Sequence, residues 1–301
     1  MLKMYQQHLH SGSTPALWEE LWSDGSFDES LRFCDVDPLR SLFERYAHQD
    51  TLMLEGGCGR GQYVAYYTAR GVRVVGLDFA SETLSKLRAR FPHLMLCDGD
   101  VAALPFRDES FDLYYSGGVV EHFESGAEPA LHEAQRALRP DGVLLISVPY
   151  LSPLRRILSP FKAKLWKRVS HAEVEAPEER RGRQFFQYIY TPGEFEKLLS
   201  ATGFQVIEKQ GYAILWGLCD LPLMQRAMNL WNRPSKDSHS VAVVEQVTKP
   251  AAHFINDKPL ASSLLRRLVI NEDDSVPVAG LGVRVLRWTC ANMMMYVCRR
   301  A

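Results

Sequence analysis

Between residues 51 and 148, short apolar runs alternate with amphipathic stretches. We predict helices over 63–70 and 81–91, the second with Ser81 as its N-cap, and a turn at 139–142. The predicted strands are 51–54, 72–77, 94–97, 111–115 and 143–148. A strand–helix–strand–helix order implies a mainly parallel sheet that is covered by helices on both faces.

The predicted sheet continues beyond this region. Thr191 begins another helix as the N-cap of a capping box, with Pro192 in the first helical position and Glu194 bonding back. Residues 204–207 and 293–298 are predicted strands that could pair antiparallel. The predicted fold is therefore α/β and doubly wound. Its mainly parallel seven-stranded sheet has an antiparallel C-terminal strand, and N-terminal helices and lid insertions are added to it.

The chain divides into four predicted parts. Two stretches, 151–190 and 211–285, do not follow the strand–helix order. They lie between core elements, as the lids or walls of a binding site do. The parts are an N-terminal helical cap at 1–50, a core at 51–210 with a lid insertion at 151–190, an insertion or substrate wall at 211–285, and a final core strand in 286–301.

Composition excludes several classes of function. With 35 basic and 36 acidic residues, the 301-residue chain has a formal net charge of −1, so we expect no nucleic-acid partner. No apolar run reaches the roughly 18 residues of a membrane-spanning helix, and the start lacks the form of a secretory signal. The six cysteines form no C-x-x-C pair, which argues against a zinc ribbon or a disulfide scaffold and for a cytoplasmic protein. No cluster has metal-ligand spacing, so no metal is expected.

Residues 151–171 form a basic amphipathic segment. They contain six Lys or Arg residues and no acid, interleaved with leucines and Trp166. Such a segment suits an anionic substrate or peripheral contact with an anionic membrane surface. A solvated lid face is the plainer interpretation, because the acidic stretch 173–179 follows and could neutralise the segment.

The most informative motif is Leu-Glu-Gly-Gly-Cys-Gly-Arg-Gly at residues 54–61, a strand that runs into a glycine-dense turn before a helix. Glycines allow a sharp turn and let a ligand approach bare main chain. A dinucleotide fingerprint fails whether it starts at Gly57 or at Gly59, and a phosphate loop fails because no Gly-Lys-Ser/Thr follows. The pattern present is acidic-x-G-x-G-x-G, from Glu55 to Gly61.

This pattern resembles the first motif of the class I, Rossmann-like S-adenosylmethionine-dependent methyltransferases, of the small-molecule type called type 11. The resemblance covers residues 51–210 and implies S-adenosylmethionine as cofactor. An acid before the turn suits a cationic sulfonium ligand better than a diphosphate. By resemblance, Asp78 would accept hydrogen bonds from the ribose hydroxyls, and Asp100 would accept one from the adenine amine. The backbone amide of Val101 would face the adenine ring. The predicted cofactor-binding residues are Glu55, Gly56, Gly57, Cys58, Gly59, Gly61, Asp78, Phe79, Asp100, Val101, Ser116 and Gly117.

The methyl acceptor is expected beyond the fourth predicted strand, at residues 116–123, because ligands of such sheets bind at the carboxyl ends of strands. His122 is the first candidate for a general base, since imidazole titrates near neutral pH. Tyr190 and His171 are alternatives on the lid side. Each of the three could instead serve loop support or packing. The aromatic stripe around Trp18 has helical spacing, and it fits either a helix over the acceptor pocket or core packing.

The whole arrangement looks like enzymes of bacterial polysaccharide and secondary-metabolite pathways. This resemblance implies methyl transfer to a small-molecule or glycan acceptor, on oxygen. A lipid, quinone or polyketide acceptor is the near alternative. From other classes, a nicotinamide-dependent oxidoreductase and a non-catalytic S-adenosylmethionine-binding protein stay open.

Overall fold

The protein is built around a seven-stranded sheet, seen in a computed structural model that describes residues 1–6, 14–23, 27–162, 166–168, 184–221, 223–224, 268, 270–275 and 279–301. The strand order is β4-β3-β2-β5-β6-β10-β9. The strands are β2 (Leu52–Gly56), β3 (Arg73–Asp78), β4 (Met95–Asp98), β5 (Phe111–Gly117), β6 (Leu138–Pro149), β9 (Phe204–Tyr212) and β10 (Met293–Arg300).

Parallel pairing dominates the sheet. Strand β2 pairs in parallel with β3 and β5, β3 pairs with β4, and β5 pairs with β6. Strand β10 is antiparallel to both β6 and β9, with Tyr296 opposite Ile146 on one side and Lys209 on the other. The predicted fold class is confirmed, including the antiparallel C-terminal strand, which lies inside the sheet with β9 at its edge.

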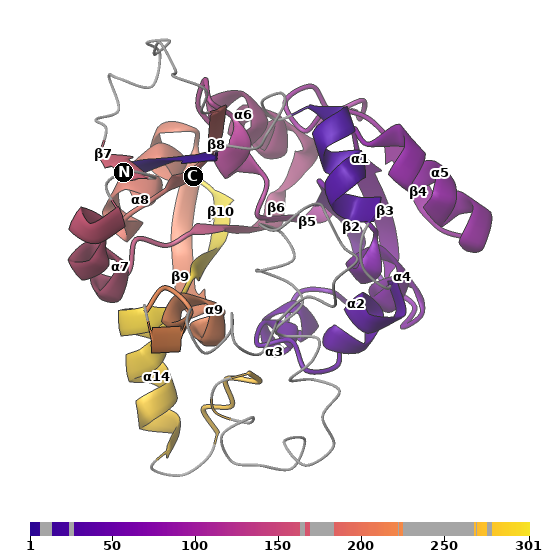
Figure 1. Ribbon diagram of the computed structural model, residues 1–301. Coiled ribbons are helices and arrows are strands. Elements are labelled where there is room, and N and C mark those ends of the chain that lie inside the picture. The colour runs from indigo at the N-terminus through magenta and orange to yellow at the C-terminus, as the bar shows by residue number, and fades with distance from the viewer. Residues whose placement is uncertain are drawn as a thin grey trace, which may run out of the picture.

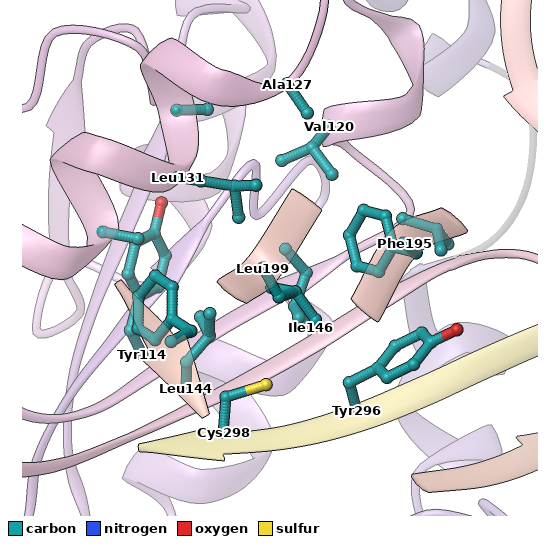
Figure 2. Packing of buried hydrophobic residues seen from close by; sticks show 14 of the residues in the cluster. Tyr114, Val120, Ala127, Leu131, Leu144, Ile146, Phe195, Leu199, Tyr296 and Cys298 are labelled. Atoms are coloured by element: carbon teal, nitrogen blue, oxygen red, sulfur yellow. The ribbon is translucent and has the colours of Figure 1, made fainter. Parts of the chain in front are cut away.

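Helices cover both faces of the sheet. Along β6, Leu144 and Ile146 face one apolar cluster, which α6 (Glu128–Ala137) and α8 (Pro192–Ala201) complete (Figure 2). The alternate residues Val143 and Leu145 face a second cluster, with α4 (Gln62–Thr68) and α5 (Ser81–Arg90). This two-sided burial explains why the core strands are continuous apolar runs.

The N-terminal part contains α1 (Pro15–Ser23), α2 (Phe27–Phe33) and α3 (Arg40–Glu44), which agrees with the helices predicted there. Residues 2–6, however, form a strand. This strand, β1 (Leu2–Gln6), lies between β7 (Trp166–Arg168) and β8 (Gln184–Ile189) in a small antiparallel sheet. Leu2 is buried against Leu151 and Ile189, a partnership that the local sequence alone does not reveal.

Two local predictions are corrected. Ser81 is the first residue of α5 and Ala80 is its N-cap, because the Ser81 side chain bonds Asp98 while Asp78 Oδ1 accepts the Ala80 N–H at 2.9 Å. Residues 139–142 form no separate turn; they belong to β6 and make a bulge where the register with β5 shifts. The Thr191 capping box is confirmed, with Pro192 in the first turn.

The remaining elements leave the sheet near its β9–β10 end (Figure 1). They are α7 (Pro153–Leu158), the short 3-10 helix η2 (Ser159–Lys162), α9 (Ile214–Leu218) and α14 (Ala279–Cys290). A second short 3-10 helix, η1 (Val120–His122), directly follows β5. Within the described part of the chain, no helix has the length and apolar character that crossing a membrane requires.

Candidate cofactor and active site

The glycine-rich turn joins β2 to α4. Gly57, Gly59 and Gly61 all have positive φ, at 75°, 49° and 70°, a region that other residues enter only with strain. A Cβ on Gly57 would lie 2.4 Å from Val119 Cγ2, so the turn and the segment after β5 are in close contact. The bare main chain of the turn is therefore required by both backbone geometry and space.

Two buried carboxyl groups flank this turn. Asp78, at the end of β3, accepts hydrogen bonds from the N–H of Gly59 at 2.7 Å and of Ala80 at 2.9 Å. Glu55, in β2, is 4% exposed and accepts a hydrogen bond from the Val64 N–H. Burial raises the pKa of both groups, and the negative charge of Asp78 adds to the rise at Glu55. A cation bound beside the pair would oppose that rise.

The third strand tip adds the predicted adenine-side residues. The Gly99 N–H donates to the Asp78 carbonyl at 3.0 Å, which brings the segment after β4 next to the end of β3. Asp100 is exposed, and its Oδ1 accepts the Ala102 N–H at 2.9 Å, while Val101 is buried in the core. The predicted residues of the first three strand tips thus lie along one edge of the sheet.

Helix α1 covers the glycine turn. A Cβ on Gly59 would lie 2.9 Å from the Trp22 ring, and the Arg60 guanidinium lies over that ring, 5.4 Å from its centroid. One turn earlier on α1, Trp18 stacks on Trp22 and meets the His122 ring edge-on at 4.7 Å between centroids. The aromatic stripe of α1 therefore joins the cofactor turn to the segment after β5.

Polar atoms without hydrogen-bond partners indicate whether this edge of the sheet suits an adenosyl sulfonium ligand. Among the described residues, the buried atoms Glu55 Oε2, Ser116 Oγ and Glu121 Oε2 have no hydrogen-bond partner. Glu55 lies beside Tyr115 in the β2–β5 pairing, so these atoms belong to neighbouring strand ends. Buried polar atoms without partners are costly, and they are common where a ligand supplies the missing bond. The residues present therefore fit the cofactor.

His122 lies in η1, directly after β5. Its Nδ1 is 2.7 Å from the Phe186 carbonyl oxygen, so Nδ1 carries the proton and Nε2 keeps a lone pair. Burial lowers the pKa of His122 to about 4, and the ring packs against Phe186 as well as Trp18. The imidazole is neutral at physiological pH and held in one orientation.

Glu121 is the more basic neighbour of this histidine. Its side chain is 2% exposed, and its Oε1 lies 3.9 Å from His122 Nε2. Burial raises the pKa of Glu121 to about 8. A carboxyl group whose pKa lies near neutrality is suited to general acid or base chemistry.

A group of buried polar side chains lies on the same side as Glu121. Burial raises the pKa of Tyr212, and the charges of Asp37, Glu121 and Glu272 add to the rise. The Tyr212 hydroxyl donates to Ser147 Oγ at 2.9 Å, at the β6 end. Sequence reasoning missed Asp37, Tyr212 and Glu272, because they come from segments far apart in the chain. The one local signal was that Tyr212 follows a predicted strand.

Other candidate residues have different surroundings. Tyr190 is buried against Tyr188 and Phe195, and its main chain bridges Pro149 and Leu151. Burial raises the pKa of Tyr190 well above its ordinary value, and the charge of Glu121 adds to the rise, so its hydroxyl stays protonated. His171 lies outside the described residues.

The basic segment is also corrected at one position. Arg155 is buried and points inward, with its Nε 2.6 Å from Asp220 Oδ2 and its Nη1 bonded to the carbonyls of Tyr150 and Asn292. It therefore does not belong to an exposed cationic face. Of the other five basic residues, the structure describes the side chain of Arg156 alone, which is exposed.

Comparisons with known proteins agree with this site. Residues 54–146 match the family model "Methyltransferase domain". A probable S-adenosylmethionine-dependent methyltransferase of Mycolicibacterium smegmatis is 36% identical over 110 residues, which are 36% of this chain and 42% of that protein. A malonyl-[acyl-carrier protein] O-methyltransferase of Pectobacterium atrosepticum is 34% identical over 120 residues, 40% of this chain and 47% of the relative.

A further relative, the probable tRNA methyltransferase 9B of Homo sapiens, is 37% identical over 100 residues, 33% of this chain and 21% of that protein. The chain thus matches less than half the length of each of these relatives. The shared region holds the glycine turn and the strand tips described above. Residues 54–146 are thus similar to a methyltransferase domain, and the relatives matched over this region include probable S-adenosylmethionine-dependent methyltransferases.

Proposed function

We propose that this protein transfers a methyl group from S-adenosylmethionine to oxygen on a small-molecule or glycan acceptor. The observation that carries the proposal is the glycine turn between two buried carboxyl groups, Glu55 and Asp78, with unpaired polar atoms at the next strand end. An uncompensated pair of acids beside bare main chain suits a cationic ligand.

Each group at this edge has a distinct proposed role. When bound, S-adenosylmethionine supplies an electrophilic methyl group. Asp78 accepts hydrogen bonds from the ribose and also holds Gly59 in place through its amide. Asp100 and Val101 bind the adenine. Gly56, Gly57, Cys58, Gly61, Phe79, Ser116 and Gly117 complete the proposed cofactor contacts.

The acceptor side contains two candidate bases. An oxygen acceptor must lose a proton, so a nearby base adds to the effect of alignment. His122 has a free Nε2 lone pair, but burial lowers its pKa to about 4, which makes it a weak base at neutral pH. Glu121, with a pKa raised to about 8 by burial, is the stronger base of this pair. We therefore propose that Glu121 takes the proton and that His122, whose Nε2 lies 3.9 Å from Glu121 Oε1, lines the acceptor side next to it.

The polar groups around Tyr212 favour a hydroxylated acceptor, as in polysaccharide or secondary-metabolite biosynthesis. A lipid, quinone or polyketide acceptor is the alternative. All six cysteines lie in the described part and are unpaired, which supports a reducing compartment such as the cytoplasm.

Calorimetric titration tests the cofactor site. We expect S-adenosylhomocysteine to bind and NAD to give no heat, and binding of NAD alone would refute the proposal. Asp78→Asn should weaken the binding of S-adenosylhomocysteine by about 1.5–3 kcal/mol, the range for a hydrogen bond to a charged group. The exposed Asp141→Asn serves as the matched control and should bind like the unaltered protein.

A labelled-methyl assay with glycans, hydroxylated metabolites, quinones and lipids tests the acceptor side. Glu121→Gln should reduce turnover about 100-fold or more while cofactor affinity changes little. His122→Ala should depress turnover more than cofactor affinity, and to a smaller extent than Glu121→Gln. Full activity of either variant would remove the role assigned to that residue, and cofactor binding without turnover of any acceptor would favour a non-catalytic binding protein.

A further inference from the structure

Three elements, α7, η2 and α14, expose large apolar side chains. On α7 and η2 these are Ile157 and Phe161, and on α14 they are Leu281, Val285 and Trp288. The five are between 52% and 86% exposed, and they are five of the eight exposed large hydrophobic residues in the described part of the chain. Exposed apolar residues that gather in one region indicate an interaction site.

Contacts hold α7 and α14 next to each other. The two helices pack together, and the Tyr150 hydroxyl, just before α7, donates to the Trp288 carbonyl at 2.9 Å. Both helices lie at the β9–β10 end of the sheet, away from α4 and α5 (Figure 1). We call the exposed side chains of Ile157, Phe161, Leu281, Val285 and Trp288 the α7–α14 surface.

The spacing on α14 separates its packed residues from its exposed ones. Leu281, Val285 and Trp288 are four and three residues apart, which aligns them along one face of a helix. Val283, in contrast, is 1% exposed. The helix thus already has a buried apolar face, and the exposed stripe is a second one that packing among the described residues does not explain.

The charged residues on α7, η2 and α14 themselves are all basic. None of α7, η2 and α14 contains Asp or Glu. Arg155 is occupied by Asp220, and Arg287 by Glu272 and Asp274. Arg156 and Arg284 are exposed instead. Aliphatic and aromatic side chains flanked by arginines, with no acid on the same elements, complement the interface of an anionic lipid bilayer.

We propose that the α7–α14 surface docks this protein on an anionic phospholipid membrane. Phe161 and Trp288 enter the boundary between headgroups and acyl chains, and Arg156 and Arg284 contact lipid phosphates. The surface lies apart from the glycine turn, so docking does not compete with the proposed cofactor site. Membrane docking at this surface does not depend on methyl transfer.

Flotation of the full chain with vesicles tests the proposal. We expect binding to vesicles of phosphatidylcholine with phosphatidylglycerol and little binding to phosphatidylcholine alone, with a decrease as salt rises. The double variant Phe161→Ser/Trp288→Ser should reduce the vesicle-bound fraction about tenfold, and Arg156→Glu/Arg284→Glu should do the same on anionic vesicles. Thermal unfolding of each variant verifies that it is folded.

The matched control is Met95→Ser/Ile207→Ser, which removes two exposed apolar residues that lie on β4 and β9, outside the surface. It should bind vesicles like the unaltered chain. Failure of the unaltered chain to bind anionic vesicles, or equal loss in the control, would overturn the proposal. Sedimentation velocity adds a further check: a dimer that the Phe161/Trp288 variant dissociates, without vesicle binding, would assign this surface to a second copy instead.

Discussion

Glu121 has a buried carboxyl group whose Oε2 lacks a partner among the described residues. Its neighbour His122 illustrates how burial acts in opposite directions on an acid and a base. Desolvation raises the pKa of Glu121 to about 8 and lowers that of His122 to about 4, because the neutral form is favoured in both cases. The sequence singled out His122 as a candidate base, whereas burial gives Glu121 the pKa nearer to neutrality.

A stability measurement follows from the Glu121 pKa. The folded-state pKa lies above the ordinary value of 4.5, so the stability that the protonated carboxyl contributes is complete below about pH 4.5. It is lost as the pH rises toward about 8. As the pH rises from 5 to 8, the unfolding free energy of the unaltered chain should therefore fall relative to that of Glu121→Gln. We expect a relative change on the order of a few kcal/mol, measured by urea unfolding at pH 5 and pH 8. The exposed Glu82→Gln is the control; a gap that does not widen with pH would contradict the assignment.

At the scale of elements, the glycine turn combines local and distant requirements. Its positive φ values are a local property that the glycine pattern predicts. Its covering is not local, since Val119 and Trp22 approach the turn from the segment after β5 and from α1. Strand β6 shows the opposite outcome, because Pro140 and Gly142 indicated a turn while pairing with β5 and β10 keeps the backbone extended.

Gly57→Ala tests the turn. The substitution puts a Cβ in a left-handed conformation and against Val119, so we expect a loss of roughly 2–4 kcal/mol in unfolding free energy. S-adenosylhomocysteine affinity should fall as well. Gly193→Ala is the matched control, because no atom lies within 4 Å of its Cβ position in α8. It should leave stability unchanged or raise it by up to about 1 kcal/mol. Equal behaviour of the two variants in chemical unfolding would rule out the tight turn.

At the scale of the whole molecule, a buried ion pair connects the segments that leave the sheet. Arg155 in α7 bonds Asp220 after α9 and the Asn292 carbonyl before β10, so one side chain joins three regions of the chain. The remaining exposure of the two side chains is 9% and 14%. A buried ion pair of this kind adds little net stability, but it fixes how the three regions are arranged. Loss of one partner leaves the other as an unpaired buried charge.

Asp220→Ala should therefore cost roughly 3 kcal/mol in unfolding free energy. The double variant Arg155→Met/Asp220→Leu should recover most of that loss, because no unpaired charge remains buried. Glu44→Ala, which removes an exposed pair with Arg40, is the control and should cost less than about 0.5 kcal/mol. If the double variant were less stable than Asp220→Ala, the pair would have a role beyond charge compensation.

The sequence by itself determined the features that depend on short stretches of chain. The alternation of apolar runs predicted the seven strands of the core, and the glycine and acid spacing predicted the cofactor turn, because periodicity and positive φ are properties of one segment. The Thr191 capping box belongs to the same group, since its bonds span three residues.

Only the tertiary structure decided what depends on distant partners. The pairing of β1 with β7 and β8, the inward turn of Arg155, and the gathering of Asp37, Glu121 and Tyr212 all join residues far apart in the chain. Burial and charge environment follow from those contacts, and they in turn determine pKa values and exposed surfaces. Local sequence states which groups are available, while their neighbours across the fold set the chemistry that each group can perform.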